Sequence, residues 1–160
     1  WLWIDGVIMG ELDVGHLALF VGTAFHAVVE KELGRRHRDV RPSWGSLIEH
    51  LVGTTRSIGE LAERMEVTQQ AASKAVSELV KLGYVERVAD EADARVTRVR
   101  LSKRGDALVA DSRRVRERCN ARLVKRVGRK RIDKTREVLG ELLDELGGLE
   151  RVRTRRIVPR

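Results

Sequence analysis

A change in the spacing of apolar residues, from helical to strand-like, constrains the fold more than any other feature of this sequence. Two helical patterns lie close together, with apolar positions at Ile58, Leu61, Ala62 and Met65 and then at Ala72, Val76 and Leu79. Only the short turn EVTQQ separates them, and two helices joined so tightly cross at a steep angle. After Gly83 the runs YVERVAD and VTRVRLS alternate with a period of two, which is typical of a hairpin. The sequence therefore predicts a helix-turn-helix with a two-stranded wing, in a mainly α protein of the α+β type.

Capping residues mark where these helices begin and end. Ser43 is the expected N-cap of a short helix, and Ser57 with Glu60 three residues later has the pattern of a capping box. Thr68 is placed to cap the second helix of the pair. Gly83 ends that helix in the left-handed region, where a side chain would be penalised.

Long helical patterns flank this unit on both sides. The first runs from residue 14 to about 36, and two more run over 106 to about 127 and 132 to about 146. A small winged domain cannot cover their apolar stripes, so packing against a second copy is the economical solution, and we expect a twofold homodimer. The expected division is an N-terminal dimerisation region 1–40, a winged domain 41–105, C-terminal dimerisation helices 106–148 and a basic tail 149–160.

Charge and composition restrict the class of partner. The chain has 32 Lys and Arg against 24 Asp and Glu, and this net charge of +8 attracts polyanions such as nucleic acid or acidic membrane surfaces, between which charge alone does not choose. The longest nearly apolar stretch, residues 17–29, is shorter than a membrane span, and the first residues do not resemble a signal peptide. A single cysteine, Cys119, fits a reducing compartment. We therefore expect a cytoplasmic protein that does not associate with membranes.

The outer side of the second helix is unusual for a solvated surface. A solvated helix usually carries Glu and Lys four residues apart, whereas Gln70, Ser73, Lys74 and Ser77 stand here. Amide and hydroxyl groups donate and accept hydrogen bonds, so this side is suited to a polar partner.

These residues and those of the wing resemble the MarR (multiple antibiotic resistance regulator) family of transcription factors over nearly the whole chain. The family's wing signature, D-x-R-x-x-x-V-x-L-T-x-x-G, stands here as DARVTRVRLSKRG, residues 93–105. Ser102 replaces the usual Thr and retains its hydroxyl. The segment TQQAASKAVSELVKLGYVER is similar to the family's recognition helix and to the motif that closes it.

The resemblance implies a homodimer that binds a pseudo-palindromic operator in double-stranded DNA. Each recognition helix would lie in a major groove and each wing along a minor groove, where amides and cations suit base edges and an arginine suits a narrow groove. The candidate DNA-binding residues are Thr68, Gln69, Gln70, Ser73, Lys74, Ser77, Asp93, Arg95, Arg98 and Arg100.

Simpler interpretations of some of these residues stay open. Ser77 is as well explained as a solvent-exposed helix residue, and Asp93 with Arg95 as a salt bridge that only shapes the hairpin. Strand alternation predicts that Arg98 and Arg100 face outward together. The acidic wing tip ADEADAR suggests that only Arg95 approaches DNA. The family's redox-sensing members carry a cysteine near the first helix, so the position of Cys119 argues against peroxide sensing.

The sequence favours a binding protein over an enzyme. It contains no Gly-rich phosphate loop, no metal-spaced histidine pair and no nucleophile signature, so we expect no catalytic activity, no cofactor and no metal. Phe25, His26 and Trp44 are candidates for an aromatic-effector pocket, although ordinary core packing is the simpler interpretation. His26, Glu30 and His50 are a second candidate set, for an effector or metal site, but ordinary core or surface histidines are the simpler interpretation.

The functional expectation is a sequence-specific transcriptional regulator, in the form of a repressor that a small molecule releases from DNA. The alternative is a winged-helix protein that binds DNA without sequence preference as an architectural factor, or that binds a protein partner, with no ligand response. The ratio of specific to non-specific affinity at fixed salt separates the two.

Overall fold

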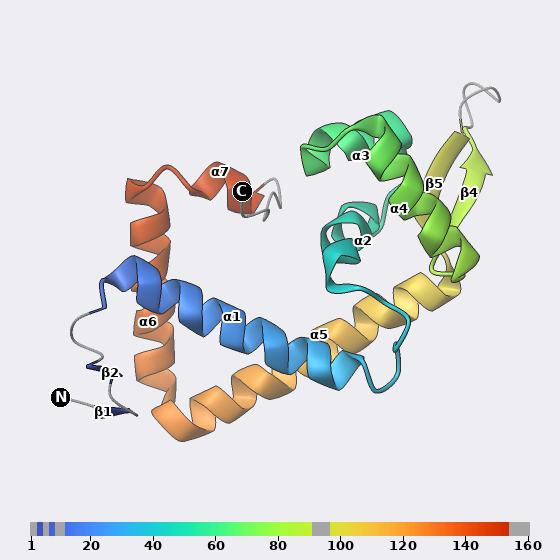
Figure 1. The fold of residues 1–160 in the computed structure, drawn as a ribbon. Coiled ribbons are helices and arrows are strands. Elements are labelled where there is room, and N and C mark those ends of the chain that lie inside the picture. Colours follow the sequence, from blue (N-terminus) through green and yellow to red (C-terminus); the bar gives the residue numbers. More distant parts are fainter. Residues whose placement is uncertain (1–2, 5–6, 9–11, 91–96, 154–160) are drawn as a thin grey trace.

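A small winged domain and a set of long helices make up the fold (Figure 1). The computed structural model describes residues 3–4, 7–8, 12–90 and 97–153. The winged domain contains η2 (Pro42–Trp44), α2 (Gly45–Leu51), β3 (Arg56–Ser57), α3 (Ile58–Met65), α4 (Gln69–Lys81), β4 (Val85–Ala89) and β5 (Thr97–Leu101). Outside it lie β1 (Trp3–Ile4), β2 (Val7–Ile8), α1 (Val14–Leu33), α5 (Lys103–Val127), α6 (Arg129–Glu145) and α7 (Leu149–Arg153). The expected fold class is confirmed.

The helix-turn-helix is fixed at its ends by the predicted caps. The Ser57 backbone N–H donates to Glu60 Oε2 (2.6 Å) and the Glu60 N–H donates to Ser57 Oγ (3.2 Å), which completes the capping box of α3. Thr68 Oγ1 accepts from the Ala71 N–H at the start of α4 (3.1 Å). Gly83 follows α4 with a φ of +74°, in the left-handed region where glycine carries no penalty.

The prediction of Ser43 as a helix N-cap is wrong. A turn of 3₁₀ helix, η2, begins at Pro42 and places Ser43 inside it, and α2 begins at Gly45 without any side-chain cap. Proline has a φ already suited to a first helical position, so the chain turns one residue earlier than the serine suggests.

The wing belongs to a three-stranded antiparallel sheet in the order β3-β5-β4, and not to an isolated hairpin. Strands β4 and β5 pair from Val85 opposite Leu101 to Ala89 opposite Thr97, as predicted. The two-residue strand β3 joins the other edge of β5, with Arg56 opposite Val99. Two residues are too few to show a period of two, which is why the sequence pattern did not reveal β3.

Helix α5 begins before Gly105, and not after it as the sequence suggested. Ser102 Oγ accepts from the Gly105 N–H (3.1 Å) and donates to the Gly83 carbonyl (2.5 Å), so this hydroxyl caps α5 and ties it to the end of α4. A Cβ at Gly105 would collide with the Tyr84 carbonyl and the Leu101 side chain. The glycine therefore permits the first turn of α5 to pack directly against the start of the wing.

Two apolar clusters hold the described chain together. The larger fills the winged domain around Leu47, Leu61, Leu79, Tyr84 and Val99 and extends to Leu108 of α5. The smaller joins Val29 of α1 to Val115 and Cys119 of α5. Helix α5 thus passes from the winged domain along α1 to α6 (Figure 1). The beginning of the expected basic tail is helical, as α7.

Candidate nucleic-acid interface

The exposed face of α4 gathers the predicted groove residues on one surface. Gln69, Gln70 and Lys74 are exposed, and Ser73 is partly exposed. On the opposite side Ala72, Val76 and Leu79 are fully buried and fix the rotation of the helix about its axis. Among the described residues, no side-chain hydrogen bond holds any of these four side chains and no ion pair holds Lys74, so their donors and acceptors are available to a polar partner.

Ser77 has a partner that the sequence did not indicate. The Arg87 guanidinium of β4 donates to Ser77 Oγ (3.1 Å), and Arg87 is itself exposed. This contact attaches the wing to the groove face of α4 and adds an arginine beside it. Arg87 is part of the motif that closes the recognition segment, so the sequence did mark this residue. The sequence did not show that Arg87 lies beside Ser77, because that contact depends on how β4 turns back along α4.

The described wing arginines lie on the side of β5 opposite its buried residues, as alternation predicted. Val99 is fully buried, whereas Arg100 is exposed and donates to Glu86 (2.6 Å). Arg98 is more enclosed, because it pairs with Asp90 of the wing and with Glu60 of α3 (3.2 Å). These contacts raise the pKa of Arg98, first through its hydrogen bond to Asp90. Asp93 and Arg95 lie outside the described residues.

A partly buried polar network connects the end of α4 to the long helices. Tyr84 OH donates to Asp39 Oδ1 (2.8 Å) and lies 3.0 Å from His37 Nδ1, and His37 Nε2 lies 3.2 Å from Asp111 Oδ2 on α5. Arg104 donates to Asp39 (2.8 Å) and to the Leu82 carbonyl, with its guanidinium 4.2 Å from the centre of the Tyr84 ring.

The electrostatics of the network follow from burial and hydrogen bonding. Burial, with the hydrogen bond to Asp39 and the charge of Asp39, raises the pKa of Tyr84 to about 12. Burial acts to raise the pKa of Asp39 as well, but the hydrogen bond from Tyr84 and the contacts with Arg104 lower it overall. The hydrogen bond with His37, followed by the charges of Arg36 and Arg114, lowers the pKa of Asp111. The tyrosine therefore stays neutral while both carboxylates stay charged.

The candidate effector residues do not form one site in the described structure. Trp44 is buried in the winged-domain core, and Phe25 packs on the smaller cluster between α1 and α5. His26 is exposed on α1 and lies 3.0 Å from Glu30. His50 is buried in α2, away from that pair. Within the described residues, no three His, Cys, Asp or Glu side chains are grouped to hold a metal.

Cys119 is buried on α5, where an arginine guanidinium donates to its sulfur. None of the helices in the described part of the chain is both long and apolar enough to cross a membrane.

The helix-turn-helix and the wing define a winged-helix fold, the kind of fold in which the second helix can enter a DNA major groove. Residues 38–96, which include most of the winged domain, match the model of the MarR family, and the chain resembles the winged-helix regulators of this family. No curated protein matches the sequence.

Solved structures support the fold. A MarR family protein from Bacillus stearothermophilus has a TM-score of 0.70 at 20% identity, over 84% of this chain and 93% of that one. The transcriptional regulator Tm0710 from Thermotoga maritima has a TM-score of 0.65 at 18% identity, over 83% and 93%. A mutant of MepR from S. aureus, solved with an oligodeoxyribonucleotide, has a TM-score of 0.64 at 16% identity, over 85% and 99%. The chain therefore shares its fold with these three proteins.

Proposed function

We propose that the protein is a homodimeric repressor that reads a pseudo-palindromic operator with α4 and is released from it by a small molecule. The exposed Gln69, Gln70 and Lys74 carry this proposal. They can form hydrogen bonds, none of them has a side-chain partner among the described residues, and the buried stripe on the other side of α4 turns them outward. Glutamine suits adenine and lysine suits guanine or a phosphate. The MepR structure with an oligodeoxyribonucleotide supports DNA as the partner, which would place the protein in the cytoplasm.

The wing has two roles in this proposal. Arg95, which the sequence pattern puts at the wing tip, is the proposed minor-groove contact, and Asp93 would orient it. Arg100, more than half exposed, serves as a phosphate contact by exchanging Glu86 for DNA. Arg98 acts mainly by holding the wing to α3, because its guanidinium is already shared between Asp90 and Glu60.

Dimerisation is supported by apolar side chains that the described chain leaves uncovered. On α1, Phe20 is 59% and Val21 60% exposed, and on α6, Leu143 is 40% exposed. Others on the long helices and α7 are Val14, Leu19, Val28, Leu123, Val127, Val138, Leu139, Leu146, Leu149 and Val152. Exposed apolar surface on this scale marks an interaction site, and a second copy is the partner that brings an identical surface to it.

Ligand release is supported by the polar network at the junction of the long helices and the winged domain. Tyr84 joins the end of α4 to Asp39 and His37, so a change at the junction alters the position of the recognition helix. Two recognition helices must sit about one turn of DNA apart, roughly 34 Å, and a small change in that spacing prevents simultaneous binding. The coupling requires only about 1 to 3 kcal/mol.

The test is the ratio of affinities for a duplex selected from random DNA and for a shuffled duplex of the same composition, at one salt concentration. A reader of sequence gives a ratio of about a thousand or more. A ratio near one would favour the alternative function, in which an architectural winged-helix protein binds DNA through charge alone.

A further inference from the structure

The corner between α5 and α6 carries a cluster of cations that the interface on α4 does not use. Six of the ten residues from 122 to 131 are Lys or Arg, and none is Asp or Glu. Only Gly128 separates the two helices, so these side chains gather where the chain turns from one helix to the next. We call this surface the basic corner, and its six exposed cations are Arg122, Lys125, Arg126, Arg129, Lys130 and Arg131.

The basic corner lies far from the recognition helix. Figure 1 shows it at one end of α5, with β4, β5 and α4 at the other end. Helix α5 has 25 residues, and at about 1.5 Å per residue it is roughly 37 Å long. We propose that the basic corner binds the phosphate backbone of a second segment of double-stranded DNA, without reading its sequence, while α4 holds the first. This surface is additional to the operator-reading face and does not require that α4 reads sequence.

The cations of the basic corner are not neutralised within the described part of the chain. No ion pair joins any of the six to a described carboxylate, and one of them, Arg122, donates to the sulfur of a buried cysteine. Farther along α6 the usual pattern of a solvated helix returns. Lys134 pairs with Glu137 there (2.9 Å). Arg136 pairs with Asp133 in the same way (3.4 Å). The basic corner therefore differs from an ordinary charged helix surface.

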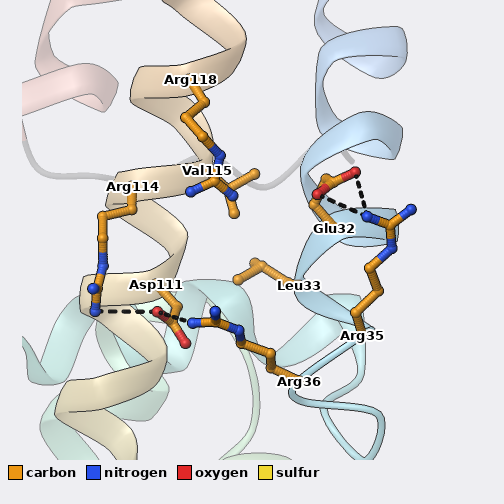
Figure 2. A pocket seen from close by; sticks show the side chains of 8 residues that line it. All are labelled: Glu32, Leu33, Arg35, Arg36, Asp111, Arg114, Val115 and Arg118. Carbon is orange, nitrogen blue, oxygen red and sulfur yellow. Dashed lines mark hydrogen bonds and ion pairs between the residues drawn. The ribbon is translucent and has the colours of Figure 1, made fainter.

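The arginines in the middle of α5 also differ from those of the basic corner. Figure 2 shows Arg114 of α5 and Arg36, from the segment after α1, both paired with Asp111 (3.2 and 3.3 Å). These side chains line a cavity of about 280 Å³ between α1 and α5. Their charge is partly compensated inside the chain, so the uncompensated charge of α5 is concentrated at its far end.

The cations at the start of α6 do not serve the helix that carries them. Arg129, Lys130 and Arg131 form its first turn, which contains no acidic residue and has no side-chain cap. The start of a helix carries a partial positive charge, so acidic residues are favourable there and cations are unfavourable. A bound polyanion removes this disadvantage, because its phosphates are attracted both by the cations and by the start of the helix.

The composition of the basic corner favours nucleic acid over a protein or a membrane. Four of the six cations are arginines, whose planar guanidinium groups can bind a phosphate through two hydrogen bonds. The centres of protein–protein interfaces are depleted of charged residues, whereas interfaces with DNA are strongly positive. Helices that lie on membranes usually insert aromatic side chains, and α5 and α6 contain none. Double-stranded DNA is the polyanion that the proposed function already brings to this protein.

A titration with a second duplex tests the proposal on the full chain. The protein is first saturated with the unlabelled duplex that it binds best, and a labelled duplex of shuffled sequence is then added at low salt. The labelled duplex should bind, and its affinity should fall steeply as salt is raised. A chain that combines Arg126→Gln, Arg129→Gln and Arg131→Gln should bind it about tenfold or more weakly, with a salt slope lower by about two to three. Its affinity for the first duplex should be unchanged.

The matched control removes the same charge elsewhere. Lys31→Gln, Arg113→Gln and Arg116→Gln replace three exposed cations of α1 and α5 that lie outside the basic corner. This chain should bind the second duplex as the unsubstituted protein does. Unchanged binding by the corner variant, or equal weakening in the control, would overturn the proposal.

Two further measurements detect other occupants of the basic corner. The second half of α6 carries Glu141, Asp144 and Glu145, which a second copy could bring to the corner. Dissociation of a dimer in the corner variant, with binding of the second duplex unchanged, would show that contact. Vesicles of phosphatidylcholine with phosphatidylserine test a membrane. Vesicle binding that the corner variant loses, with second-duplex binding unchanged, would assign the corner to lipid. Either result overturns the proposal.

Failure of operator reading can be told apart from failure of this proposal. A chain with Gln69→Ala, Gln70→Ala and Lys74→Ala lacks the recognition face, yet it should keep a weak, salt-sensitive affinity for shuffled DNA. Adding the three corner substitutions should weaken that residual affinity by about tenfold or more. A residual affinity that does not change would contradict the proposal, whether or not α4 reads sequence.

Discussion

At the scale of single residues, Tyr84 connects the parts of the molecule that function requires. Its place after Gly83 was visible in the sequence as the start of the wing. Its hydroxyl partners, Asp39 and His37, are more than forty residues away and become neighbours only because α5 and the segment before α2 converge on it. Sequence reasoning found the α4 face because helical periodicity is local, and missed this network because no local pattern records it.

Lys74 and Gln70 provide the first prediction at this scale. Lys74→Ala or Gln70→Ala should weaken operator binding by about 1 to 3 kcal/mol if the side chain contacts a base edge, and should relax the preference at one base pair per half-site. Both side chains are exposed, so thermal stability should hardly change. The charge control is Lys130→Ala on α6, which should leave sequence preference intact. Unchanged binding by folded α4 variants would remove this helix from the recognition role.

Asp111 provides a second prediction, which concerns how the free energy of unfolding changes with pH. Its pKa in the folded chain is lowered, first by the hydrogen bond with His37, so its interactions stabilise the fold above the unfolded value of about 3.8 and are lost as pH falls through the lower folded value. Asp111→Asn should therefore be less stable than the unsubstituted chain near neutral pH, and the difference should shrink below about pH 4. Denaturant titrations from pH 3 to 7 measure it. A difference that stays constant over this range would show that the charge of Asp111 does not contribute.

At the scale of elements, predictions succeeded where one residue type carries a definite local chemistry. The capping box of α3, the Thr68 cap and the left-handed Gly83 are of this kind. They failed where a neighbour in space decides the outcome. Strand β3 forms because β5 offers an edge, and α5 extends back to Lys103 because Ser102 reaches the Gly83 carbonyl.

A substitution at Gly105 tests the close contact between the first turn of α5 and the start of the wing. Gly105→Ala should destabilise the fold by about 2 kcal/mol or more, because the new methyl group meets the Tyr84 carbonyl, which is backbone and cannot move aside alone. The control is Gly45→Ala at the start of α2, where no atom lies within 4 Å of the added Cβ and the backbone is helical. There the change should be neutral or stabilising by up to about 1 kcal/mol. Similar unfolding midpoints for the two variants would show that α5 does not depend on this close approach.

At the scale of the whole molecule, the long amphipathic helices were predicted but their arrangement was not. Periodicity predicted the apolar positions of α1, α5 and α6. Only the structure shows which of these positions become buried between α1 and α5 and which remain exposed. The cavity between α1 and α5 was equally hidden, because its arginines come from two segments about eighty residues apart.

The exposed apolar surface predicts an obligate dimer. Leu143→Glu should weaken self-association, since it places a charge in a surface that the second copy would bury. Val67→Glu is the matched control, because Val67 is also 40% exposed but lies on the winged domain. Sedimentation at micromolar concentration should find dimers for the unsubstituted chain and for Val67→Glu, and a shift toward monomers for Leu143→Glu. A stable, folded monomer of the unsubstituted chain would rule out the dimer.

Selection of binding sites from random double-stranded DNA tests the central claim most directly, because it examines sequence reading and twofold symmetry together. A dimer that inserts one α4 into each of two successive major grooves should enrich an inverted repeat, with half-sites about 10 base pairs apart from centre to centre. Enrichment of a single asymmetric site, or of no sequence at all while binding still falls steeply with salt, would contradict the account of this chain as a symmetric reader of an operator.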